Sequence, residues 1–103
     1  ASDDSIRAAV DATLERWNVI GRVLPDDELH EKGMAFAREL ASGPTRAHAM
    51  TKRIVRAYLE GGVPAADEIT PDAFSGLFAT QDLQRAVRSF LEEGPGKATF
   101  EGR

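Results

Sequence analysis

The chain has 103 residues, of which 42% are hydrophobic, and its 13 basic and 17 acidic side chains give a formal net charge of -4. A chain of this length forms one domain, and its acidic balance without a basic stripe argues against nucleic-acid binding. The absence of cysteine excludes disulfides and thiolate metal sites. No apolar run approaches the ~20 residues that cross a bilayer, and no signal peptide is recognisable, so we expect a cytoplasmic protein without a membrane partner.

The first half of the chain predicts two amphipathic helices with a short extended segment between them. Over residues 5–17 the apolar side chains recur at helical spacing, at Ile6, Val10, Leu14 and Trp17. Residues 19–24 are too few and too β-branched for an independent helix, so we expect an extended segment there. A second helix is predicted to begin at the acidic residues 26–28 and to end before the Ser-Gly-Pro sequence at 42–44.

The middle of the chain predicts a helix, a stop and a proline-dependent break. A helix is expected from Pro44 or Thr45 to Glu60, because two glycines follow it. Pro71 removes a hydrogen-bond donor, which predicts a break or kink there, with Thr70 capping a new helix. That helix places three apolar side chains on one face, those of Phe74, Leu77 and Phe78.

The clearest helical pattern follows Thr80. Its apolar positions are spaced i, i+3, i+4, i+7 and i+8, at Leu83, Ala86, Val87, Phe90 and Leu91. The Gly-Pro-Gly sequence at 94–96 is predicted to end this helix and to start an extended tail. The sequence therefore predicts a mainly α fold of four to five short helices.

Motifs that carry chemistry are absent from the sequence. We find no phosphate-binding loop, zinc-binding helix motif or nucleophile elbow, and we predict no catalytic residue, no metal site and no cofactor. His30 and His48 are 18 residues apart and neither has a second metal ligand four residues along its helix, so we interpret both as structural. A basic stripe could attract phosphates, but a solvated helix face is the preferred interpretation of Arg46, Lys52, Arg53 and Arg56.

Four sequence segments carry a family resemblance. They are the sequence from Leu77 to Glu93 with its continuation Lys97-Ala98-Thr99-Phe100, the sequence from Leu14 to Leu29, Ala41-Ser42-Gly43-Pro44, and Met50-Thr51-Lys52-Arg53. Together they resemble the end of an enoyl-CoA hydratase/isomerase (crotonase) family enzyme. The resemblance covers residues 11–103, which leaves residues 1–10 as a divergent or truncated N-terminal segment.

The resemblance implies a C-terminal helical domain that serves as a trimerisation and lid domain. In the family, these helices cover the acyl-CoA site and build a trimer, often a dimer of trimers, so the implied partners are a coenzyme A thioester and further copies of the chain. The family's oxyanion hole of two backbone N–H groups and its acid/base glutamates belong to an N-terminal core. No residue of this sequence matches those motifs, so the resemblance assigns no catalytic residue here.

Two positions match places where family members contact substrate. Phe74 matches an aromatic residue that lines the CoA site, sometimes that of a neighbouring subunit, although core packing is an equal alternative. Lys97 lies where a basic tail residue meets a CoA phosphate. The sequence departs from the family at Phe90–Gly94, where two cations are missing, and at Gly21, where Asn or Asp is frequent.

Two functional hypotheses follow from the sequence. In the first, the chain is the C-terminal assembly and lid domain of an acyl-CoA enzyme. In the second, it is a stand-alone helical interaction module without catalysis. The residues that distinguish a hydratase from an isomerase lie outside the sequence.

Overall fold

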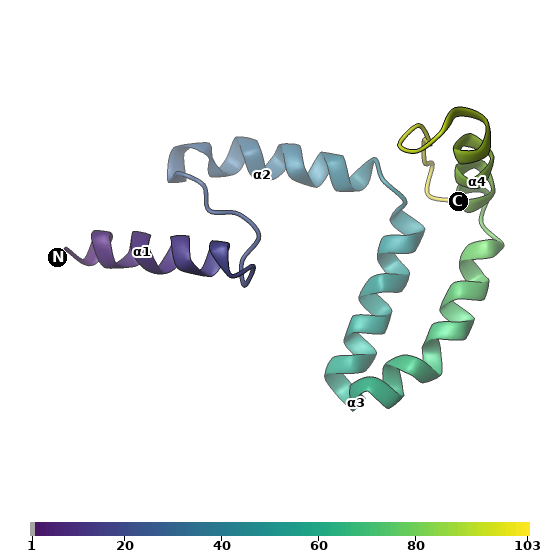
Figure 1. The fold of residues 1–103 in the computed structure, drawn as a ribbon, viewed down its shortest axis with the longest axis horizontal. Helices are drawn as coiled ribbons and strands as arrows, with labels where there is room; N and C mark the ends of the chain where they lie inside the picture. The colour runs from purple at the N-terminus through teal and green to yellow at the C-terminus, as the bar shows by residue number, and fades with distance from the viewer. Residues whose placement is uncertain (1) are drawn as a thin grey trace. The chain divides into compact units, whose positions relative to one another are not determined.

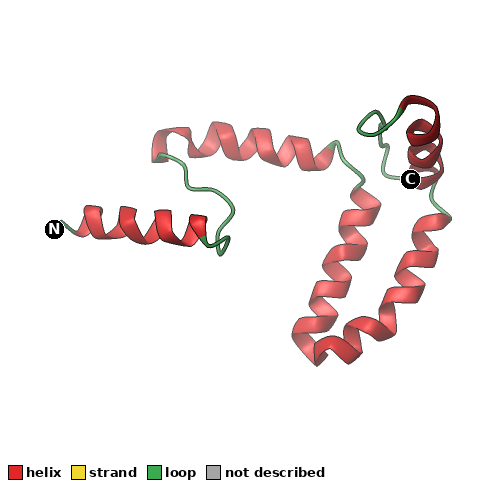
Figure 2. Ribbon diagram, in the orientation of Figure 1, coloured by secondary structure: helices red, strands yellow, loops and turns green. Residues whose placement is uncertain are grey.

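The computed structural model describes residues 2–103, and in this part of the chain it contains four helices and no strand (Figure 1, Figure 2). The helices are α1 (Asp3–Arg16), α2 (Asp26–Ala41), α3 (Thr45–Phe78) and α4 (Gln81–Glu93). The mainly α prediction is therefore confirmed. The chain divides into two compact units, Ala1–Ala35 and Phe36–Arg103.

Helix α1 begins and ends as its local sequence dictates. The hydroxyl of Ser2 accepts a hydrogen bond from the Ser5 N–H at 3.2 Å and so caps the first turn. At the other end, Asn18 adopts a positive φ of 57°, a conformation that asparagine tolerates better than most residues. The Glu15 carboxylate then accepts a hydrogen bond from the Val23 N–H. The extended segment predicted at 19–24 is a bend followed by irregular chain, and it pairs with no strand in the described residues.

Helix α2 has the bounds that its terminal sequences predict. Three acidic side chains occupy its first turn, where they complement the positive end of the helix dipole. Glu28 also pairs with Lys32 one turn later. At the C-terminus, the Ser42 N–H donates to the Arg38 carbonyl at 2.9 Å before the chain turns into α3.

Helix α3 is a hairpin of two arms, and its bend lies at Gly62. This residue has φ 73° and ψ -169°, which only glycine adopts readily, and Figure 1 shows the second arm running back from the bend at an angle to the first. A side chain at Gly61 would place its Cβ 2.7 Å from that of Ala65, so the neighbouring position also requires glycine. The helix end predicted at Glu60 lies two residues before this bend, and the assigned helix α3 continues beyond it to Phe78.

A break or kink was predicted at Pro71, and the break is wrong. The helix continues through Pro71, and the Thr70 hydroxyl donates to the Ala66 carbonyl at 2.7 Å inside the helix instead of capping a new one. Pro71 is exposed, and the only non-helical backbone within α3 is at Gly62. Helical contacts on both sides of the proline therefore outweigh the one backbone hydrogen bond that it cannot donate.

Helix α4 confirms the strongest sequence prediction. The Thr80 side chain caps it by accepting from the Leu83 N–H at 3.2 Å, and Gly94 ends it with φ 89°. In the described residues only two side chains are classed as buried, those of Ala73 and Asp82, which are 5% and 2% exposed. The helices therefore leave most of their apolar side chains in contact with solvent.

We expect the substitution Gly62→Ala to destabilise the hairpin by about 1–3 kcal/mol, because a Cβ is strained at this positive φ. Gly76→Ala is the matched control, since Gly76 lies in the same helix and an added Cβ would meet nothing within 4 Å. That control should stabilise the helix by roughly 0.5–1 kcal/mol. Urea unfolding followed by circular dichroism measures both effects, and equal effects of the two substitutions would contradict the assigned bend.

Candidate functional site

Both substrate-contact residues predicted from the sequence lie on exposed surface of the second unit. Phe74 is 60% exposed on the second arm of α3, and its ring centroid is 5.7 Å from that of Phe78, with 47° between the ring planes. Lys97 is exposed in the tail that follows α4. Phe74 packs against Phe78 but lies in no core of the described residues, and both its substrate contact and its core-packing alternative stay predictions.

The second unit also contains a built site that the sequence analysis did not predict, at the junction of α3, α4 and the tail. Neither Phe74 nor Lys97 lines it. Its centre is the carboxylate of Asp82, which is 2% exposed at the start of α4. Asp82 Oδ1 accepts from the Glu101 N–H at 2.8 Å, and Oδ2 accepts from the Gly102 N–H at 2.7 Å. The Asp82 N–H in turn donates to the Arg103 carbonyl at 2.8 Å.

Three charged side chains extend from this carboxylate as a chain of ion pairs. Arg85 reaches Asp82 Oδ1 with Nη2 at 3.0 Å and Glu101 Oε1 with Nη1 at 2.8 Å. Glu101 Oε2 also accepts from Arg103, whose Nη2 is 2.7 Å away. Arg85 thus forms a bridge between α4 and the tail, and its planar fork suits two carboxylates at once.

The pKa values of both carboxyl groups are lowered by these contacts. The backbone N–H of Glu101 is the main cause that lowers the pKa of Asp82 below its ordinary value of 3.8, while burial acts in the opposite direction. The Arg85 hydrogen bond, followed by the one from Arg103, lowers the pKa of Glu101 below 4.5. A carboxylate stabilised in its charged form by N–H donors holds the tail in place and is a poor proton acceptor.

An apolar cavity of about 60 Å³ lies beside these charges. Phe100 of the tail lines it together with Leu77 at the end of α3 and Leu83 of α4. The start of α3 contributes Pro44 and Ala47, so both ends of the α3 hairpin meet here. A Cβ added to Gly102 would lie 3.1 Å from Thr45 Oγ1, which shows how closely the tail backbone approaches α3.

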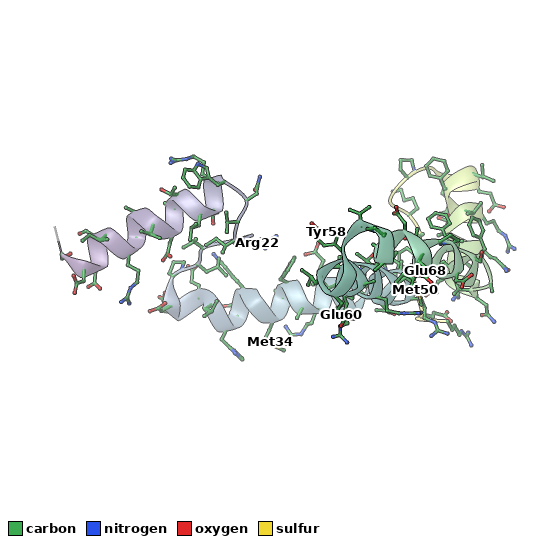
Figure 3. The ribbon with its side chains drawn as sticks, turned by 90° about the horizontal axis from the view of Figure 1, so that it is seen from below. Arg22, Met34, Met50, Tyr58, Glu60 and Glu68 are labelled. Carbon is green, nitrogen blue, oxygen red and sulfur yellow. The ribbon has the colours of Figure 1, made fainter. Side chains whose placement is uncertain are left out.

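The basic stripe predicted from the sequence lies on the first arm of α3. Lys52, Arg53 and Arg56 are exposed and line an open groove of about 530 Å³ that also includes Leu59. Figure 3 shows Tyr58 and Glu60 projecting from the same arm. Arg46 instead lines the junction cavity. This exposure agrees with the interpretation of the stripe as a solvated helix face.

The described residues offer no arrangement for a resident metal ion. Residues 2–103 contain no group of three histidine, cysteine, aspartate or glutamate side chains that could hold one. None of the helices in this range has the length and apolar character that a membrane span requires. The contacts of the junction are those that recognise a peptide backbone and charged side chains.

Two residues of the junction stand in a sequence segment that the sequence analysis quoted, but no role was predicted for either. Thr80 and Asp82 lie in the Phe-Ala-Thr-Gln-Asp sequence that was quoted for the family resemblance. A threonine cap followed by an aspartate is a common helix start. Nothing in that local pattern shows that the aspartate will bind backbone N–H groups 19 and 20 residues further along the chain.

Because both pKa values are lowered on folding, the contribution of Asp82 and Glu101 to stability is complete above their ordinary pKa values of 3.8 and 4.5. It is lost as the pH falls below about 4.5 and through the lowered values. We expect Asp82→Asn to lower the urea midpoint at pH 7 and to remove the larger part of this acid dependence. Urea unfolding between pH 7 and pH 3 measures both effects.

Glu92→Gln is the matched control for this prediction, because Glu92 is an exposed carboxylate on the same helix. It should leave both the midpoint and its pH dependence close to those of the unchanged chain. The assignment of Asp82 fails if its substitution has the same small effect as that of Glu92.

Comparison with known proteins identifies the family. The enoyl-CoA hydratase/isomerase family model matches residues 6–103. The probable enoyl-CoA hydratase of Rhizobium meliloti (strain 1021) is 30% identical over 92 residues, which are 89% of this chain and 35% of that relative. The chain thus spans about a third of the relative's length, and no solved structure matches it. Since the family match takes in nearly the whole chain, this protein belongs to the enoyl-CoA hydratase/isomerase family.

Proposed function

We propose that this chain is the C-terminal helical part of an enzyme acting on acyl-CoA thioesters, where it contributes subunit assembly and part of the cover over the coenzyme A site. The observation that carries the proposal is the exposure of its apolar side chains. Ala73 is the only hydrophobic residue classed as buried in the described part of the chain. A chain of about 100 residues normally buries more than half of its unfolded surface. Another protein surface that covers the exposed apolar side chains of these helices would complete that burial.

The exposed apolar residues lie on helices that the resemblance assigns to assembly and to the lid. On α4 the side chains of Val87, Phe90 and Leu91 are 49%, 60% and 77% exposed, and their i, i+3, i+4 spacing places them on one face. Phe74 and Phe78 form a second exposed pair near the end of α3. Their burial would contribute about 25 cal/mol for each Å² removed from water.

The two substrate-contact residues fit this proposal through their accessibility. The exposed ring of Phe74 is available to contact an acyl-CoA held by the rest of the enzyme or by a neighbouring subunit. The exposed ammonium group of Lys97 is available to a phosphate of coenzyme A. A trimer, or a dimer of trimers, and a cytoplasmic location stay predictions from the sequence.

One observation favours the alternative that the chain is a stand-alone interaction module. The tail closes the junction of α3 and α4 with contacts that all come from within residues 36–103. The contacts that form this junction therefore require no partner protein. The exposed apolar surface outweighs this observation, because a stand-alone protein gains stability from burying such surface in itself.

We expect the isolated 103-residue chain not to hydrate a short enoyl-CoA, because the family resemblance places the oxyanion hole and the acid/base glutamates in a different part of the enzyme. Loss of the conjugated thioester absorbance measures the reaction. An authentic hydratase added to the same assay is the positive control, and a mock preparation from the expression host measures contamination. Turnover that copurifies with the chain and exceeds the mock value would contradict the proposal.

We also expect the isolated chain to self-associate through the apolar face of α4. Leu91→Glu should weaken association by at least about tenfold, because it places a charge in the surface that becomes buried. Gln84→Glu adds the same charge at an exposed polar position of α4 and should have little effect. Light scattering over a concentration series measures both variants, and a monomer at all concentrations up to the millimolar range would favour the stand-alone module.

A further inference from the structure

The tail that follows α4 docks on the junction as an extended peptide. It leaves the helix through Gly94 and Gly96, which have φ values of 89° and 77°, and it has no regular secondary structure from there to Arg103. Its hydrogen bonds to the helices are concentrated at residues 101–103. The tail is thus joined to α4 by a glycine-containing hinge and is held at its far end.

Three consecutive tail residues each interact with the junction in a different way. Phe100 lines the apolar cavity beside Leu83. Glu101 is held by the guanidinium of Arg85 at 2.8 Å. Gly102 has φ 77°, and any side chain there would approach Thr45 Oγ1 to 3.1 Å. The junction therefore distinguishes the sequence Phe-Glu-Gly from most other tripeptides.

A single residue of α4 binds the tail backbone from Glu101 to Arg103. Asp82 accepts the N–H groups of Glu101 and Gly102 with its two carboxylate oxygens and donates its own N–H to the Arg103 carbonyl. Hydrogen bonds to an ionised carboxylate are stronger than those between neutral groups. These three bonds fix the direction and register of the peptide, while the side-chain contacts select its sequence.

We propose that the junction of α3 and α4 is a binding site for an extended peptide carrying Phe-Glu-Gly, filled here by the chain's own tail and equally able to take the tail of a second copy. The receptor residues Asp82, Arg85, Leu83 and Thr45 all lie on the helices, so the receptor does not depend on which copy supplies the peptide. Exchange of an identical segment between copies keeps every contact, and only the hinge changes.

This inference goes beyond the proposed function and does not rest on it. A peptide site at the junction requires neither an acyl-CoA substrate nor association through the exposed face of α4. A failure of the peptide test therefore leaves the proposed function standing, and a lack of self-association through α4 leaves the peptide site standing.

The test uses the full chain with its own tail weakened by Phe100→Ala as the receptor. The probe is a fluorescent peptide with the sequence of residues 97–103 and an amidated end, and binding is measured by fluorescence anisotropy. We expect the receptor to bind this peptide at least about tenfold more tightly than the unchanged chain does, because the unchanged chain fills its own site. Adding Asp82→Asn to the receptor should weaken binding by at least about tenfold, through loss of the carboxylate acceptor.

Matched peptides test the sequence selectivity of the site. A peptide with Gly102→Ala should bind at least about tenfold more weakly than the native peptide, since its Cβ meets Thr45 and strains the backbone. Ala98→Gly is the control peptide, because it changes a residue outside the tripeptide, and it should bind like the native sequence. Equal binding of the native and Gly102→Ala peptides, or equal binding with and without Asp82, overturns the proposal.

The far-ultraviolet circular dichroism of each receptor verifies that its helices are intact. If Phe100→Ala is not helical, the full chain with Gly102→Ala serves as the receptor, because it weakens the same tail and leaves the apolar cavity unchanged. Absence of peptide binding to a helical receptor overturns the proposal.

Discussion

The buried carboxylate of Asp82 is the interaction on which the order of the second unit depends. Removing a charge from water is costly, and here that cost is offset by two backbone N–H donors and one guanidinium. The same bonds hold the tail, which brings Phe100 to the apolar cavity between the two ends of α3. One aspartate therefore joins the start of α4 to the tail, and Phe100 of the tail in turn meets both ends of α3.

The local sequence predicts the helices well because local forces define their ends. Serine or threonine caps, acidic first turns and terminal glycines satisfy backbone groups within a few residues, and α1, α2 and α4 follow these signals closely. The bend in α3 is harder to predict because two candidate breakers compete. Gly62 adopts a backbone conformation that other residues avoid, whereas Pro71 only lacks a hydrogen-bond donor. The local sequence does not show at which of these two residues the helix will bend.

The candidate sites differ in how far they depend on contacts between distant residues. Phe74 and Lys97 were selected from a family pattern, and the structure shows them accessible without testing their roles. The junction was not predicted, because Asp82 binds residues 19 and 20 positions further along the chain. Helical periodicity relates only residues that are a few positions apart. Aspartate early in a helix is so common that its presence carries little information about a partner in the tail.

The scarcity of buried apolar side chains also has a thermodynamic consequence for the isolated chain. Both the heat-capacity change of unfolding and the sensitivity of stability to denaturant grow with the apolar area that unfolding exposes. Because Ala73 is the sole buried hydrophobic residue in the described range, we expect both quantities to be small for the separate chain. We therefore expect a broad thermal transition for the separate chain, and a sharper one when a partner covers the exposed faces.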